Sequence, residues 1–168
     1  MKKLLLGIVI LLAVAVSGAD ALIGAGIGLS ANLARDPSIT GLALEVNLPI
    51  PIIPLMATRL EANYYQVSNP IAFTMIPVMI TQTAELPMLP IYAGFGVGIT
   101  LLSSSNAAFV APSTVLNYNG YVGYKKSLMP LTDFFIQGGY TSSKFDLGAG
   151  LSYDNSGFEV KTGIRFGI

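Results

Sequence analysis

The chain has 168 residues, of which 52% are hydrophobic and only 11% are charged, and it contains no cysteine. One domain fits in this length once a targeting segment is set aside, and the missing cysteine excludes disulfides, a lipidated N-terminal cysteine and thiolate metal sites. From Asp20 onward seven Lys and Arg stand against nine Asp and Glu, a net charge near −2 that gives no indication of nucleic-acid binding.

The first predicted element is a signal peptide over residues 1–19. Lys2 and Lys3 provide a positively charged start, and residues 4–16 are an apolar stretch that is shorter than the about 20 residues a membrane-spanning helix needs. The small residues Ser17, Gly18 and Ala19 suit signal peptidase. We therefore expect cleavage after Ala19, which leaves residues 20–168 as the exported domain. An uncleaved anchor is the alternative.

Beyond this segment no apolar run approaches about eighteen residues, which excludes a protein that spans a membrane with helices. Apolar residues alternate instead with small or polar ones. In residues 23–33 the odd positions are all Ile, Leu or Ala, and the even positions are Gly, Ser and Asn. Successive side chains of a strand point to opposite faces, so this pattern predicts strands with one apolar face. The same alternation recurs in residues 41–48, 91–101, 144–153 and 158–168.

Four further windows are less regular: residues 56–67, 71–83, 115–125 and 134–140. Window 71–83 is apolar on both faces and contains Pro77, which is unusual inside a sheet. The nine windows conflict with the even strand numbers of bacterial single-chain barrels. We predict eight strands, with windows 71–83 and 144–153 as the two candidates for a loop, and ten strands as the alternative.

The face opposite the apolar one decides the fold class, because it is dominated by glycine and every charge of the five regular windows lies on it. Glycine is a poor choice for a sheet face in water, but it suits the crowded interior of a narrow barrel. We therefore predict an all-β fold, an antiparallel up-and-down transmembrane β-barrel with its apolar face toward lipid. A soluble β-domain, such as a lipocalin-like barrel, is the alternative.

Proline-rich breaks at residues 49–54, 87–90 and 128–133 predict short turns on one rim of the barrel. The opposite rim would carry residues 35–38, 68–70 and the longer 103–114. In outer-membrane barrels the short turns face the periplasm, so this asymmetry predicts the orientation of the chain.

The layout resembles the small outer-membrane β-barrels of Gram-negative bacteria, such as the OmpA transmembrane domain and OmpX. The resemblance rests on residues 92–98 (Tyr-Ala-Gly-Phe-Gly-Val-Gly) after a proline turn and on the closing residues 163–168. It implies a monomer in outer-membrane lipid, whose last strand is recognised by the barrel assembly machinery. The implied signal residues are Val160, Ile164, Phe166 and Ile168, where Ile168 replaces the usual terminal aromatic residue.

The chain contains no histidine, so serines such as Ser103 lack the usual base, and we expect no enzyme activity. The glycine runs at residues 24–28 and 94–98 lack the spacing of a dinucleotide loop, and we expect no cofactor.

Charges predicted to face the barrel interior must be paired to offset their lost hydration. We predict a lumen charge network in which Arg59 is held between Glu45 and Glu61. The function expected is structural or that of a narrow, porin-like channel with a mostly filled lumen. The alternatives are a carrier of small hydrophobic compounds, entered through residues 106–112, and a surface adhesion module. The predicted network residues are Glu45, Arg59, Glu61, Glu159, Lys161 and Arg165.

Overall fold

The computed structural model describes residues 24–33, 39–48, 52–53, 56–68, 72–86, 89–104, 114–148 and 151–167. The predicted signal peptide, the 106–112 entrance and Ile168 lie outside these ranges. Within them all regular structure is β-strand, and no helix is long and apolar enough to cross a membrane.

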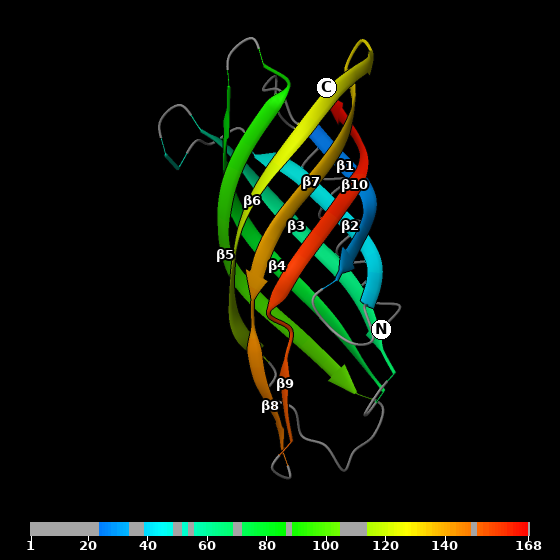
Figure 1. Cartoon of the computed structure of the whole chain (residues 1–168), viewed down its shortest axis with the longest axis vertical. Helices are drawn as coiled ribbons and strands as arrows, with labels where there is room; N and C mark the ends of the chain where they lie inside the picture. Colours follow the sequence, from blue (N-terminus) through cyan, green and yellow to red (C-terminus); the bar gives the residue numbers. More distant parts are fainter. Residues whose placement is uncertain are drawn as a thin grey trace.

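Eight strands form a closed antiparallel barrel, as predicted, and the strands are strongly tilted relative to the long axis of the molecule (Figure 1). Each barrel strand pairs with the barrel strands before and after it in the chain, and the last strand pairs with the first. The strands are β1 (Gly24–Asn32), β2 (Ile39–Leu48), β3 (Ala57–Val67), β4 (Phe73–Glu85), β5 (Ile91–Ser104), β6 (Thr114–Met129), β7 (Thr132–Ser142) and β10 (Gly157–Gly167).

The two ambiguous windows resolve the strand count. Window 71–83 is a full barrel strand, β4, whereas window 144–153 forms β8 (Lys144–Gly148) and β9 (Leu151–Asp154). These two strands pair only with each other in a separate two-stranded sheet. They form a hairpin beyond the end of the barrel opposite the C-terminus (Figure 1). The predicted count of eight is therefore confirmed for the barrel, and the ninth window is a hairpin.

Pro77 is accommodated by a local gap in the pairing between β3 and β4. The pairs run from Ala62 with Val78 directly to Tyr65 with Met75, so the ladder skips the positions opposite Pro77. On its other side Pro77 stays in register with Thr100 of β5. Because proline has no N–H to donate, the strand loses pairing only at this point and continues with unchanged register.

Lumen-facing glycines lie in register with tyrosines on the neighbouring strand. Tyr92 faces Gly123, and Tyr121 faces Gly94. A Cβ added at Gly123 would lie 2.2 Å from Cζ of Tyr92, and one at Gly94 would lie 2.6 Å from Cζ of Tyr121. The rings therefore occupy the space that a side chain would take, which is the physical reason for a glycine-rich inner face in a narrow barrel.

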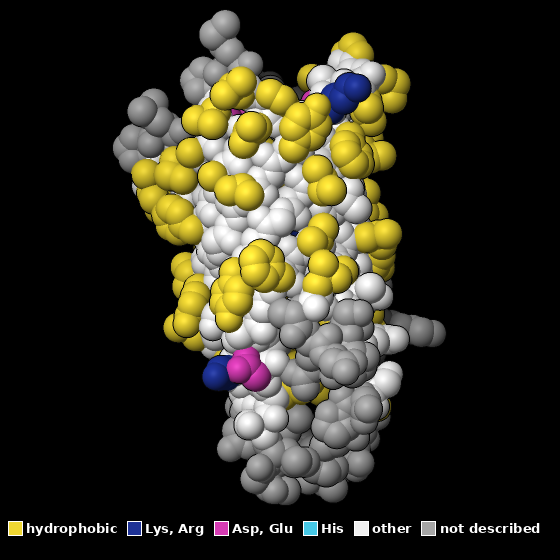
Figure 2. Space-filling view, viewed as in Figure 1, with side chains coloured by type: hydrophobic (Ala, Val, Ile, Leu, Met, Phe, Trp, Pro, Cys, Tyr) yellow, Lys and Arg dark blue, Asp and Glu magenta, His cyan; other side chains and the backbone are white. Residues whose placement is uncertain are grey.

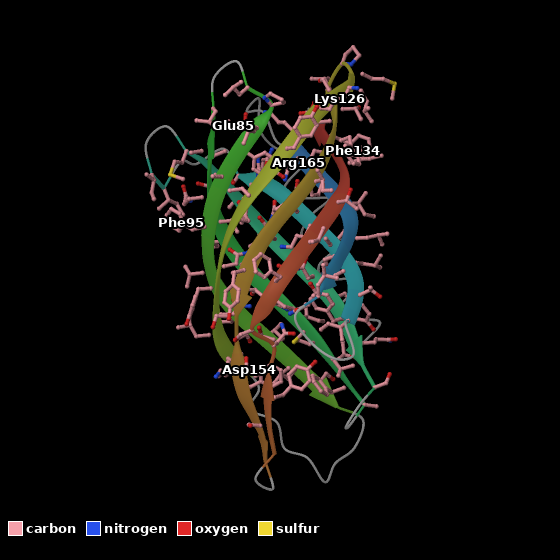
Figure 3. The ribbon with its side chains drawn as sticks, in the orientation of Figure 1. Glu85, Phe95, Lys126, Phe134, Asp154 and Arg165 are labelled. Carbon is pink, nitrogen blue, oxygen red and sulfur yellow. The ribbon has the colours of Figure 1, made fainter. Side chains whose placement is uncertain are left out.

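The outer wall is apolar, and charged residues lie at its two ends. Phe95, 51% exposed, points away from the barrel, and so does Phe134 (Figure 3). Glu85 and Lys126 lie at one end of the molecule and Asp154 at the other (Figure 3). Hydrophobic side chains cover the barrel wall between the ends on the face shown in Figure 2. An apolar outer wall is the surface expected of a transmembrane barrel.

Closure of the barrel brings two glycines face to face, and this contact can be tested. Gly28 of β1 is in register with Gly163 of β10. A Cβ added at Gly28 would lie 2.2 Å from the carbonyl oxygen of Thr162. We expect Gly28→Ala to lower the free energy of unfolding by about 1–3 kcal/mol, measured by urea titration in lipid vesicles, because the seam must widen. The matched control is Gly120→Ala, which places its Cβ where no atom lies within 4 Å. Equal losses in both variants would contradict the tight seam.

Candidate functional site in the barrel lumen

All six charged residues predicted to face the lumen are buried there. They come from three strands, β2, β3 and β10, and their exposed fractions are 8% or less. The residues are Glu45, Arg59, Glu61, Glu159, Lys161 and Arg165. The structure therefore brings these side chains into the barrel interior, where each of them takes part in one of three sets of ion pairs.

The first set is Arg165 with Glu45, whose strands flank β1. Arg165 donates from both Nε and Nη2 to the Glu45 carboxylate, and Nη2 also lies 3.1 Å from the hydroxyl of Tyr92. The guanidinium lies 4.0 Å from the ring centroid of Phe135. Gly26 of β1 is in register with both charged residues. A Cβ at Gly26 would lie 2.5 Å from Cγ of Glu45, so the glycine lets Glu45 cross β1 to reach its partner.

The second set has one cation between two carboxylates. Lys161 Nζ lies 2.8 Å from Glu61 and 3.6 Å from Glu159. Neutral donors satisfy the remaining carboxylate oxygens: Thr81 donates to Glu61 at 2.9 Å, and Asn63 donates to Glu159 at 3.0 Å. The hydroxyl of Tyr65 also donates to Glu159. This set carries a net charge of −1 inside the barrel, held by hydrogen bonds that offset part of the cost of burial.

The third set corrects a prediction, because Arg59 is not held between Glu45 and Glu61. Arg59 Nη2 lies 3.4 Å from Glu85 instead, and its Nε donates to Asn47 at 3.1 Å. Glu85 also pairs with Lys125 of β6. Glu45 and Glu61 are register partners on β2 and β3, and each takes its cation from β10.

Sequence reasoning missed Glu85, Asn47 and Lys125 because it compared charges only on adjacent windows and ended the fourth window at residue 83. It also gave no role to Tyr92 and Tyr65, whose hydroxyls bond to the charged residues. The signal available was position: both tyrosines alternate in phase with the inward-facing glycines or charges of their own strands.

At the end of the lumen nearest the β8–β9 hairpin lies an aromatic plug that consists of Phe73, Phe145 and Tyr153. Phe145 and Tyr153 belong to the β8–β9 hairpin, and Phe73 begins β4. The rings of Phe73 and Tyr153 meet edge to face at 5.0 Å, and Phe145 stacks on Tyr153 at 5.0 Å. Tyr65 and Met75 of the barrel wall complete this core. The lumen thus has a charged half, which holds most of the ion pairs, and an aromatic plug at the hairpin end, where neutral polar side chains such as Asn117 are also buried.

The hairpin is joined to the barrel by small polar residues. Asn32 of β1 donates to the carbonyl of Asn155 at 3.0 Å. On the outside of the hairpin, Lys144 pairs with Asp154 at 2.9 Å. A hydrogen bond from Ser156 and the charge of Lys144 lower the pKa of Asp154 from 3.8 to about 2. An isolated two-stranded hairpin is marginally stable, so its position depends on the aromatic plug and on these contacts.

The last strand carries the predicted assembly residues on its outer wall. Ile164 and Phe166 are 37% and 46% exposed, and Val160 is half-buried on the same face. Ile168 lies outside the described residues, and a role of this strand in assembly stays a prediction. Among the residues that the structure describes, no group of three or more His, Cys, Asp or Glu side chains could hold a metal ion.

Comparison with known proteins shows a shared fold. No protein-family model matches the chain, and no curated protein matches it by sequence. Among solved structures, the chain is similar to the outer membrane protein OprG from Pseudomonas aeruginosa, with 13% identity over 88% of this chain and 96% of that one and a TM-score of 0.60. Neisserial surface protein A gives 12% identity, coverage of 86% and 95% and a TM-score of 0.55.

The outer membrane protein AlkL gives 13% identity, coverage of 90% and 93% and a TM-score of 0.53. At these identities the similarity is one of fold. The chain therefore has the fold of the small outer-membrane β-barrels, which confirms the resemblance predicted from its strand pattern.

The Arg165–Glu45 pair can be tested by removing one partner and then both. We expect Arg165→Met to destabilise the barrel by about 3–5 kcal/mol, because Glu45 would remain buried without its cation. The double variant Glu45→Gln/Arg165→Met should recover a large part of this loss, measured by urea unfolding in lipid vesicles. The matched control is Lys126→Met, since Lys126 is an exposed cation near the same rim. A double variant no more stable than Arg165→Met would contradict the pairing.

Proposed function

We propose that the chain is an integral outer-membrane β-barrel with a structural or narrow-channel role and a lumen that is closed in its resting state. The observation that carries this proposal is the combination of an apolar outer wall with a closed barrel whose buried charges are paired. Such a wall is suited to lipid, and barrel closure satisfies the backbone hydrogen bonds that lipid cannot.

The lumen charge network supports restricted passage. Side chains alone can fill the interior of an eight-stranded barrel. An ion crossing the charged half would have to part Lys161 from its two carboxylates or Arg165 from Glu45. The free energy required to break buried pairs is large, so we propose low conductance rather than an open pore. The aromatic plug adds a second barrier at the hairpin end.

The remaining parts of the proposal concern chemistry and partners. The chain has neither histidine nor cysteine, which supports a role without covalent chemistry or a cofactor. We propose outer-membrane lipid as its surroundings, the assembly machinery as its partner during biogenesis, and a monomer as its working form. The aromatic plug favours a second candidate, a carrier in which a small hydrophobic compound takes the place of these rings.

The first experiment tests location and barrel formation. We expect the protein to fractionate with the outer membrane and to migrate faster on a detergent gel before boiling than after it, because a closed barrel resists unfolding in detergent. Recovery as a soluble periplasmic protein would contradict the proposal.

The second experiment tests the two barriers in planar bilayers. We expect low conductance from the unaltered protein and from the plug variant Phe145→Ala/Tyr153→Ala, because the charged half still blocks passage. Adding Glu45→Ala/Arg165→Ala to the plug variant should raise conductance several-fold. A large open channel in the unaltered protein would contradict a closed lumen. Recovery of a co-purified hydrophobic compound, in larger amount from the plug variant because its site is vacated, would favour the carrier.

A further inference from the structure

Two proline-rich turns on the rim opposite the β8–β9 hairpin carry exposed aliphatic side chains. Ile52 is 61% exposed in the turn between β2 and β3, and Leu86 and Leu89 are 51% and 54% exposed in the turn between β4 and β5. Water-facing turns usually carry polar residues. These turns instead extend the apolar outer wall, where Ile80 and Ile91 are also exposed, up to the rim itself.

The described amides of both turns are hydrogen-bonded within the protein. In the first turn Ile53 donates its amide to Gln82 at 3.4 Å, and Met56 donates to the carbonyl of Ile53 at 3.2 Å. In the second, Leu86 donates to Ile91 at 3.1 Å and Leu89 to Leu86 at 3.2 Å. The prolines of these turns have no N–H to satisfy. Ile52, the remaining described residue of the first turn, donates its amide to Thr58. Every described N–H group in the two turns is therefore hydrogen-bonded.

Two polar residues on the outer wall hold the first turn against the barrel. Alternation places Thr58 and Gln82 on the lipid side of β3 and β4, yet they are only 1% and 5% exposed. They are register partners, and Gln82 Nε2 donates to the hydroxyl of Thr58 at 2.9 Å. The amide of Ile52 donates to that same hydroxyl at 3.2 Å. The turn thus covers two polar groups that would otherwise face lipid, and it presents its isoleucines outward.

From these three observations we propose that Ile52 and Ile53 of the first turn and Leu86 and Leu89 of the second lie in the lipid boundary of the adjoining leaflet and anchor this rim by contact with acyl chains. An unsatisfied amide is costly in that layer and harmless in water, so internal bonding of the described amides is a constraint that lipid imposes and water does not. The charged residues beside the second turn, Glu85 and Lys125, pair with each other in phase with the lumen-facing residues of β4 and β6, so they leave the outer side of this turn to apolar side chains. The proposal rests on the proposed function, because it requires a barrel in a bilayer.

The absence of tryptophan from the chain makes a direct test possible. Ile52→Trp and Leu89→Trp place single fluorophores on the two turns. Phe95→Trp on the outer wall serves as the lipid reference, and Ser152→Trp on the exposed hairpin serves as the water reference. Each variant is folded into phosphatidylcholine vesicles with and without bromine on the upper acyl carbons. We expect both turn variants to lose fluorescence to bromine and to emit at shorter wavelength, as Phe95→Trp does, and Ser152→Trp to be unaffected.

The reference variants separate the two ways in which the experiment can fail. Turn variants that match Ser152→Trp while Phe95→Trp is quenched would overturn the lipid anchor and leave the membrane barrel intact. A Phe95→Trp variant that escapes quenching would instead contradict the proposed function. A third outcome is short-wavelength emission from the turn variants without bromine quenching, together with dimers trapped by crosslinking in the same vesicles. This outcome would mean that a second copy covers the turns, and it would also overturn the anchor.

Discussion

The backbone pairing of β1 with β10 is the interaction on which the rest of this structure depends. A sheet with a free edge could not lie in lipid, because its unpaired amides and carbonyls would have no partners. Nine consecutive register pairs, from Gly24 with Gly167 to Asn32 with Glu159, remove that edge. The same closure brings the cations of β10 beside the carboxylates of β2 and β3. One contact therefore both removes the free edge of the sheet and gives the buried carboxylates their cations.

The interior shows how a narrow barrel is filled without strain. A glycine on one strand leaves room for the large side chain of its register partner on the next strand. Gly123 does so for Tyr92, and Gly26 does so for Glu45. The rings and the carboxylate then contact partners further around the wall, so the filling also connects strands that are not neighbours. Arg165 of β10, for example, contacts Tyr92 of β5.

Strand alternation was sufficient to predict the barrel, its inner face and the burial of all six charges. It failed for residues 144–153, because a barrel strand and a hairpin with one apolar face show the same alternation. In the hairpin that these residues form, Phe145 and Tyr153 pack inward. The partners of Arg59 could not be predicted either. Pairing across a lumen depends on strand tilt and on which strand closes the barrel, and the spacing of charges along one window predicts neither of them.

The facing glycines of the seam have a consequence for how the barrel closes. A slip of one residue between β1 and β10 would turn apolar side chains inward, and the hydrophobic pattern alone would penalise it. A slip of two residues keeps every side chain on its proper face, so the pattern cannot reject it. It would, however, set Gly28 against Lys161 or Arg165 in place of Gly163, where the two backbones approach too closely for any side chain. The glycine pair thus disfavours a two-residue slip between the first and last strands, which the hydrophobic pattern alone would allow.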